Sequence, residues 1–324
     1  MIVDVHSHLY PPEMTRRLEA SGVTLPFAPD APARLLEAQR QAGVDVSLIS
    51  NPFVLQRAAR HGGLDPVRTA ALYHRWVAEL CQRPEMHGHL VPLALAAPLA
   101  GEPMLAELDV ALGACGCVGI MINPSFAGAF CDGPDAEPFW AYAEARGVPV
   151  FYHPSPDLPW TPAMEDFRLV EAVARPTETT LGLARLALRG VLARHPALRL
   201  IAAHAGGTIL ALPGRLDYVH ELRGDPGFGP WDPHGLGSEE EPPSHALRRI
   251  AVDTMCFHPQ LIRLAASWLG PEHVLLGSDH PPVSVPLERS LRAVHDAHLE
   301  DVAADAAALV LGGNACRLFG LPRP

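Results

Sequence analysis

Short apolar runs alternate along the chain with longer segments in which apolar residues recur at helical spacing. The apolar runs predict eight β-strands, at Ile2–Val5, Val44–Ser50, His89–Ala96, Cys117–Ile122, Val148–His153, Leu198–His204, Arg249–Thr254 and His273–Asp279. The intervening segments predict helices at Pro32–Ala42, Thr69–Gln82, Glu102–Leu112, Pro138–Arg146, Thr179–Arg194, Pro259–Leu269 and Leu287–Leu299. Apolar strands separated by helices are typical of a parallel sheet that is covered on both faces.

Eight such units predict an α/β fold, a (β/α)8 TIM barrel that forms one domain over residues 1–324. A doubly wound sheet is the alternative, but no Gly-x-Gly-x-x-Gly turn follows the first strand. Residues 223–245, between the sixth and seventh strands, are rich in glycine, proline and acidic residues. This composition predicts a loop insertion, which is either a lid and subunit contact or a solvated loop.

Metal-binding side chains follow four of the predicted strands at the point where each strand ends. His6 and His8 end the first strand, and alternate residues of a strand share a face, so both imidazoles point the same way. His153, His204 and Asp279 end the fifth, sixth and eighth strands. In a TIM barrel these strand ends meet at the mouth that carries the chemistry, so the five side chains are expected to converge there.

A second His-x-His pattern provides an internal comparison for the first one. His87 and His89 precede the third predicted strand instead of following it. They are therefore expected at the opposite rim of the barrel, in a structural role.

Charge and composition narrow the class of partner. The 324 residues are 48% hydrophobic and 19% charged, with a net charge of −11, so no basic surface for nucleic acid or an anionic membrane is expected. Small molecules are the expected ligands. No apolar run reaches the roughly 18 residues of a membrane-spanning helix, and no signal peptide precedes the first strand. A cytoplasmic location with reduced cysteines is the resulting expectation.

The chain contains no lysine, so all 25 of its basic residues are arginines. Schiff-base chemistry, pyridoxal phosphate anchoring and the P-loop each require a lysine and are excluded. A pair of metal ions bridged by a carboxylated lysine is excluded too. Imidazoles and a carboxylate at the strand ends suit a single catalytic zinc ion with an open coordination position.

Several motifs together resemble the amidohydrolase superfamily, in its branch of decarboxylases and related hydrolases typified by aminocarboxymuconate-semialdehyde decarboxylase. The motifs are "DVHSH", "HPSP", "AHAGG", "GSDHP" and the closing "GGNACRLFGL". This resemblance implies one divalent metal ion, usually zinc with manganese as the alternative, held by His6, His8, His153 and Asp279. It also implies that His204 acts on water or substrate beside the metal, with Asp279 as its catalytic partner.

The resemblance implies decarboxylation of a small aromatic or unsaturated carboxylic acid. Hydrolysis of an amide or lactone remains the alternative, because the same five side chains would serve both reactions. Arg215, in "GRLDYV", matches an arginine that related decarboxylases send into the neighbouring subunit, which implies a homodimer. An exposed helical arginine is the competing interpretation of Arg215.

Candidate substrate-binding residues lie close to the predicted strand ends. Arg57 follows the second strand and could pair with a substrate carboxylate. Asn123 follows the fourth strand, where substrate contact and barrel hydrogen bonding are both open, and the same holds for Asp253 at the seventh. Two departures from the family pattern, Trp160 and His280, are expected to alter the pocket wall and the choice of substrate.

Overall fold

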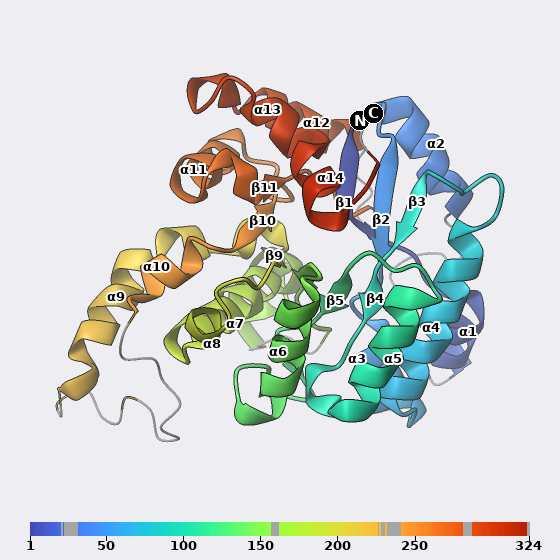
Figure 1. The fold of residues 1–324 in the computed structure, drawn as a ribbon, viewed down its shortest axis with the longest axis horizontal. Helices are drawn as coiled ribbons and strands as arrows, with labels where there is room; N and C mark the ends of the chain where they lie inside the picture. Colours follow the sequence, from blue (N-terminus) through green and yellow to red (C-terminus); the bar gives the residue numbers. More distant parts are fainter. Residues whose placement is uncertain are drawn as a thin grey trace.

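Parallel strands follow one another around a closed barrel (Figure 1). The computed structural model describes residues 1–20, 22, 32–156, 162–225, 227, 231, 241–280 and 287–322. The barrel strands in this part of the chain are β1 (Val3–His8), β2 (Val46–Ser50), β3 (Leu90–Pro92), β4 (Ala94–Leu95), β5 (Ile120–Ile122), β8 (Val150–Tyr152), β9 (Leu200–Ala202), β10 (Ala251–Asp253) and β11 (Val274–Leu275). The TIM barrel predicted from the sequence is confirmed, with β3 and β4 together filling the third position.

Backbone hydrogen bonds join the two sheets, β1-β2-β3 and β4-β5-β8-β9-β10-β11, into the barrel. Leu93 lies between β3 and β4 and donates its N–H to the carbonyl of Ile49 in β2 at 2.9 Å. This hydrogen bond keeps β3 and β4 together as the third strand of the barrel. On the other side, Val5 donates to the carbonyl of Leu276 at 2.9 Å. The last strand therefore lies beside the first, which leaves no open edge between them.

The first strand is longer than its apolar residues predict. The predicted strand ends at Val5, whereas β1 continues through His8. Backbone hydrogen bonds hold the additional residues, 6–8, in the strand. The N–H of His8 donates to the carbonyl of His280 at 2.9 Å, and the N–H of Asp279 donates to the carbonyl of His6 at 2.8 Å. Both histidines thus belong to the barrel wall.

Helices surround the barrel in nearly every connection between strands (Figure 1). In the described ranges they are α1 (Pro12–Ala20), α2 (Pro32–Ala42), α3 (Val54–Gly62), α4 (Pro66–Cys81), α5 (Glu102–Gly113), α6 (Glu137–Arg146), α7 (Arg175–Leu188), α8 (Val191–Arg194), α9 (Pro213–Glu221), α10 (Pro243–Leu247), α11 (Pro259–Leu269), α12 (Leu287–His295), α13 (Ala306–Ala308) and α14 (Asn314–Phe319). The start of α4 shows how the local sequence determines where a helix begins. The Asp65 carboxylate accepts the N–H of Arg68 at 2.9 Å, and Pro66 occupies the first turn of the helix.

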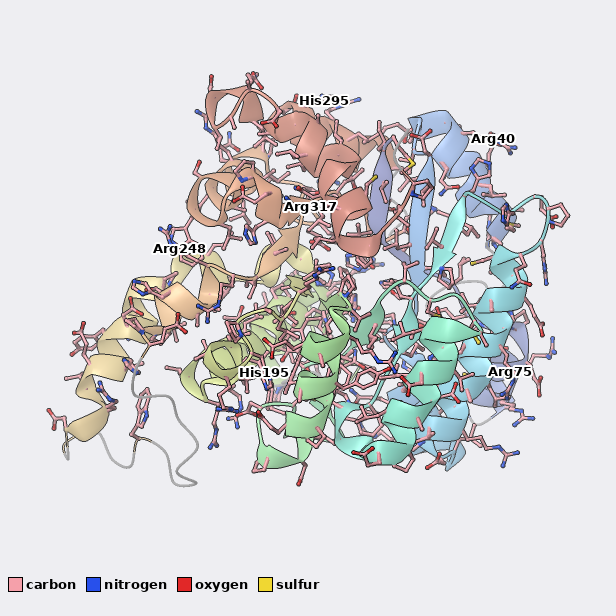
Figure 2. All side chains as sticks on the ribbon, viewed as in Figure 1. Arg40, Arg75, His195, Arg248, His295 and Arg317 are labelled. Atoms are coloured by element: carbon pink, nitrogen blue, oxygen red, sulfur yellow. The ribbon has the colours of Figure 1, made fainter. Side chains whose placement is uncertain are left out.

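The core lies between the barrel wall and the helices, and many of the charged side chains lie on the outer surface. Every residue of β1, β2, β5, β8, β9, β10 and β11 is buried. Arg40, Arg75 and Arg248 project from the outer helices (Figure 2). β6 (Ser125–Phe126) and β7 (Ala129–Phe130) form a short antiparallel hairpin beyond β5.

Other sequence expectations fall partly or wholly within the described ranges. Most of the predicted insertion at 223–245 lies outside them. All six cysteines are free thiols, as expected, and five of them are buried. Among the described helices, none is long and apolar enough to cross a membrane.

Candidate metal centre

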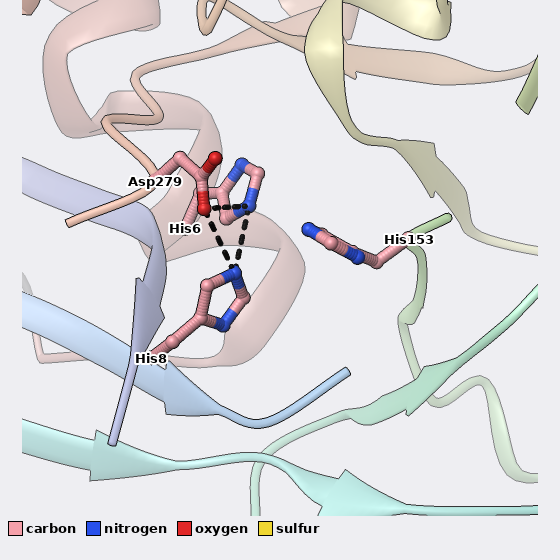
Figure 3. Close-up of side chains that lie close together, drawn as sticks. All are labelled: His6, His8, His153 and Asp279. Carbon is pink, nitrogen blue, oxygen red and sulfur yellow. Dashed lines mark hydrogen bonds and ion pairs between the residues drawn. The ribbon is translucent and has the colours of Figure 1, made fainter. Parts of the chain in front are cut away.

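Three histidines and an aspartate converge at the carboxyl ends of the barrel strands (Figure 3). His6 and His8 extend from β1, His153 follows β8, and Asp279 follows β11. One ligand atom from each of the four lies within 4.8 Å of the others. The Nε2 atoms of His6 and His8 are 3.1 Å apart, and Asp279 Oδ1 lies 3.4 Å and 3.1 Å from them.

The free lone pairs of this cluster fit a metal ion. His153 Nδ1–H donates to the carbonyl of Pro154 at 2.9 Å, so Nε2 is the acceptor nitrogen of the ring. That Nε2 is buried and has no hydrogen-bond partner. His8 Nδ1 lies 3.2 Å from the Ser50 hydroxyl, which likewise leaves Nε2 directed into the cluster. Buried imidazole nitrogens that face one another and a carboxylate are ligands for zinc and for similar divalent ions.

Asp253, at the end of β10, supports His6 from behind. Its Oδ2 lies 2.5 Å from His6 Nδ1, so the carboxylate accepts that N–H and fixes the ring orientation. Its Oδ1 accepts the N–H groups of Ala205 and Met255 at 3.0 and 3.1 Å. One carboxylate therefore positions a candidate ligand and anchors the turn that follows β9.

Burial and neighbouring charges shift the pKa values of the cluster. Burial lowers the pKa of His8 and, to well below its usual range, that of His153. Burial acts in the same direction on His6, but Asp279 and Asp253 outweigh it and raise the pKa of His6 to about 10. Burial opposes ionisation of Asp279, yet His6 and the other imidazoles hold its pKa well below its usual range. The two carboxylates thus favour a positive charge on the His6 ring, which a metal ion held at its Nε2 would supply in place of a proton.

His204 lies beside the four clustered residues. Its Nε2 is 3.5 Å from Asp279 Oδ2, and its ring centroid is 5.2 Å from that of His6 and 5.1 Å from that of His153. His204 and Asp279 both adopt left-handed backbone conformations, with φ of 57° and 59°. Backbone strain of this kind persists where the surrounding structure fixes a side chain in one place.

The predicted substrate-binding residues have different positions. Arg57 lies close to the cluster, with its guanidinium 5.0 Å from the Phe53 ring centroid. Asn123 donates its amide to the carbonyls of His153 and Pro154 at 2.9 and 3.2 Å, so it holds the turn that carries His153. The backbone of His280 pairs with that of Ser7 in β1 in a single parallel β-bridge, which places His280 at the barrel mouth. Arg215 is exposed on α9, and Trp160 lies outside the described residues.

Sequence reasoning missed two charged residues at the start of α7. Glu178 is buried and accepts hydrogen bonds at 2.6 Å from the Ser125 hydroxyl and from the N–H of Ser155; burial raises its pKa. The Arg175 guanidinium lies 4.9 Å from the Phe53 ring centroid. The helix was predicted to begin at Thr179, whereas α7 begins at Arg175. Pro176, a residue favoured in the first turn of helices, was the available signal.

Comparisons with known proteins relate this fold and site to a family. The sequence pattern of the family described as amidohydrolase matches residues 3–321. The chain is 26% identical over 333 residues to 6-methylsalicylic acid decarboxylase of Penicillium expansum, covering 98% of this chain and 95% of that protein. It is 26% identical over 222 residues to 2-amino-3-carboxymuconate-6-semialdehyde decarboxylase of Dictyostelium discoideum, covering 68% of this chain and 58% of that protein.

Solved structures share the same barrel. 5-carboxyvanillate decarboxylase from Sphingomonas paucimobilis superposes with a TM-score of 0.80 at 22% identity, over 99% of both chains. Dihydroxybenzoic acid decarboxylase from Polaromonas, solved with bound manganese and 2-nitroresorcinol, superposes with a TM-score of 0.75 at 18% identity, over 100% of this chain and 98% of that one. Because the family pattern covers almost the entire sequence, this chain belongs to the amidohydrolase family.

Proposed function

We propose that this protein is a metal-dependent decarboxylase, a carbon–carbon lyase acting on a small aromatic or unsaturated carboxylic acid. The observation that carries the proposal is the similarity, over 98% of the chain, to a protein named as a decarboxylase of 6-methylsalicylic acid. The buried cluster of His6, His8, His153 and Asp279 supports it, since these residues would hold one divalent ion. When bound, that ion would polarise the substrate's carboxylate and an adjacent oxygen.

The protein's own residues would supply the proton that replaces CO2 on the substrate carbon. Decarboxylation breaks the bond between the substrate carbon and its carboxylate, CO2 leaves, and the electron pair remains on carbon. That carbon must then receive a proton. His204 would hold a proton shared with Asp279 and deliver it at the barrel mouth, which the 3.5 Å distance between His204 Nε2 and Asp279 Oδ2 supports. Asp253 would keep His6 in one orientation throughout.

We further propose zinc as the metal, with manganese as the alternative, and a homodimer as the assembly. Three imidazoles with one carboxylate are a donor set suited to zinc. The related Polaromonas structure contains manganese, which makes that ion the competing choice. The exposed positions of Arg215 and Tyr218 on α9 support contact with a second chain.

Measuring metal content and CO2 release together tests the proposal. Purified protein is analysed for metals by elemental mass spectrometry and then incubated with 6-methylsalicylate or 5-carboxyvanillate, with CO2 and the aromatic product quantified. We expect about one zinc or manganese ion per chain and release of CO2 from at least one acid. His153→Ala, which removes a candidate ligand, should lose both.

Two results would contradict the proposal. One is a metal-loaded protein that releases no CO2 from either acid and instead hydrolyses an amide or lactone. The other is a His153→Ala variant that retains the metal, which would place the ion elsewhere.

A further inference from the structure

Phe53 has two guanidinium groups beside it, next to the candidate metal centre. Arg57, in α3, lies with its guanidinium carbon 5.0 Å from the Phe53 ring centroid, and Arg175, at the start of α7, lies 4.9 Å from it. The ring itself is buried, and its centroid is 6.3 Å from that of His153. Two helices far apart in the sequence thus bring cations to one ring that adjoins a candidate metal ligand.

Neither guanidinium forms an ion pair with a carboxylate among the residues that the structure describes. Arg57 Nη1 is buried and makes no hydrogen bond within that same set. Burial lowers the pKa of Arg175 against the attraction of Asp279, and the like charge of Arg57 lowers it further. Contact with the Phe53 ring compensates only in part for two adjacent, partly desolvated positive charges.

The charges around the candidate metal centre indicate what charge a bound substrate would carry. With a divalent ion in place, the two charges of that ion are matched by Asp279 and Asp253, which leaves the two guanidinium groups. Two further carboxylates act on Arg175: Glu171, which is exposed, and Glu178, whose buried carboxyl has a raised pKa and accepts hydrogen bonds from Ser125 and Ser155. Neither forms an ion pair with a guanidinium among the described residues, so both cations are available to an anionic group of the substrate.

We propose that Arg175 and Arg57 form an anion subsite within one chain, which binds a second carboxylate or equivalent anionic group of the substrate. Arg175 is then a specificity-determining residue that selects dianionic aromatic or unsaturated acids over monocarboxylates. The planar guanidinium forks suit a carboxylate that enters between them, beside the apolar face of Phe53. This inference rests on the proposed function, since it takes the metal centre as the position of the first carboxylate.

Calorimetric titration of the zinc-loaded protein with benzene-1,3-dicarboxylate and with benzoate tests the subsite without requiring turnover. Arg175→Met should weaken binding of the dicarboxylate by about tenfold to a hundredfold while changing benzoate affinity by no more than about twofold. Arg57→Met should have the same selective effect. Arg175→Lys, which keeps the charge but not the fork, should retain part of the preference and guards against misfolding of the Met variant.

Arg248 provides the matched control. Its guanidinium lies 5.4 Å from the Trp268 ring centroid on the outer surface (Figure 2), so Arg248→Met removes a comparable contact away from the site. It should change neither affinity. Equal losses for benzoate and the dicarboxylate in Arg175→Met, or no loss in a folded, metal-loaded variant, would overturn the proposal. A failure to release CO2 from any acid would count against the proposed function alone, because the binding preference is measured separately.

Discussion

At the scale of single residues, Asp253 determines how well His6 can serve as a ligand. Its carboxylate lies 2.5 Å from His6 Nδ1 and is held by two backbone N–H groups. Asp253→Asn keeps the shape but removes the charge, so His6 should become a weaker and less well oriented ligand. We expect zinc affinity to fall about tenfold to a hundredfold, measured by competition with a chromophoric chelator.

A substitution at a second buried carboxylate distinguishes the loss of zinc affinity from general destabilisation of the fold. Asp132 accepts hydrogen bonds from Arg185 and Arg189 at 2.9 and 3.0 Å, away from the metal cluster. Asp132→Asn should lower the free energy of unfolding while zinc affinity stays within about twofold of the parent. Equal zinc affinities for the Asp253 and Asp132 variants would show that Asp253 does not act through His6.

Glu178 makes stability depend on pH. Burial raises the pKa of its carboxyl above the ordinary value of 4.5, so the folded chain binds this proton more tightly than the unfolded chain. From about pH 4.5 upward, through the raised folded-state pKa, the contribution of Glu178 to the free energy of unfolding should therefore decrease. Glu178→Gln does not titrate, so its stability relative to the parent should increase with pH in urea unfolding. A difference that is constant with pH would contradict this.

The candidate metal ligands could be identified from the sequence, but several of the residues that surround them could not. His6, His8, His153 and Asp279 each follow an apolar run, and the barrel places such positions together. Arg175 directly follows a π-helical turn, Val170–Ala174, and its contact with Phe53 exists only in the folded chain. Contacts between residues so distant in sequence leave no periodic signal along the chain.

At the scale of elements, a glycine lets the turn after β9 pack against the first turn of α7. Gly207 has a φ of 69°, and an added Cβ would lie 2.3 Å from the carbonyl oxygen of Pro176. Gly207→Ala combines an unfavourable backbone conformation with this clash, and should lower the free energy of unfolding by about 2 to 4 kcal/mol in urea denaturation. Because the turn carries His204 and α7 carries Arg175, ligand binding should weaken as well.

Gly214, in α9, is the matched control for that substitution. A Cβ there would meet no atom within 4 Å, and its φ lies outside the left-handed region. Gly214→Ala should leave stability unchanged or raise it by up to about 1 kcal/mol, as expected for alanine replacing glycine in a helix. If both substitutions had the same effect on stability, the close packing of Gly207 on α7 would not be what requires glycine.

Element positions followed from sequence more closely than element ends. α2 and α11 occupy their predicted ranges, because their apolar residues recur regularly and a proline marks each start. The predicted helix at Thr179–Arg194 is instead α7 and α8, separated at Gly190, which has a φ of 70°. The third strand is interrupted at Leu93. The apolar pattern along the chain does not record such breaks.

At the scale of the whole molecule, the surface of α9 raises the question of assembly. Arg215 is exposed on this helix, near Tyr218 and Val219, whose large apolar side chains are also exposed. If Arg215 reaches the site of a second chain, as the resemblance to related decarboxylases implies, each site of a dimer contains residues from both chains. Arg215→Ala should then lower kcat/KM for decarboxylation by about tenfold to a hundredfold without loss of metal.

Mixing two impaired variants tests whether that arginine acts between chains. Arg215→Ala retains its metal ligands, and His153→Ala retains Arg215 but lacks a ligand. In a randomly reassembled mixture, half of the dimers are mixed, and each mixed dimer contains one site with both features. The mixture should therefore regain about a quarter of the parent activity, because a twofold-symmetric pair exchanges equivalent contacts. No recovery, in a mixture shown by mass spectrometry to contain mixed dimers, would mean that Arg215 acts within its own chain or not at all.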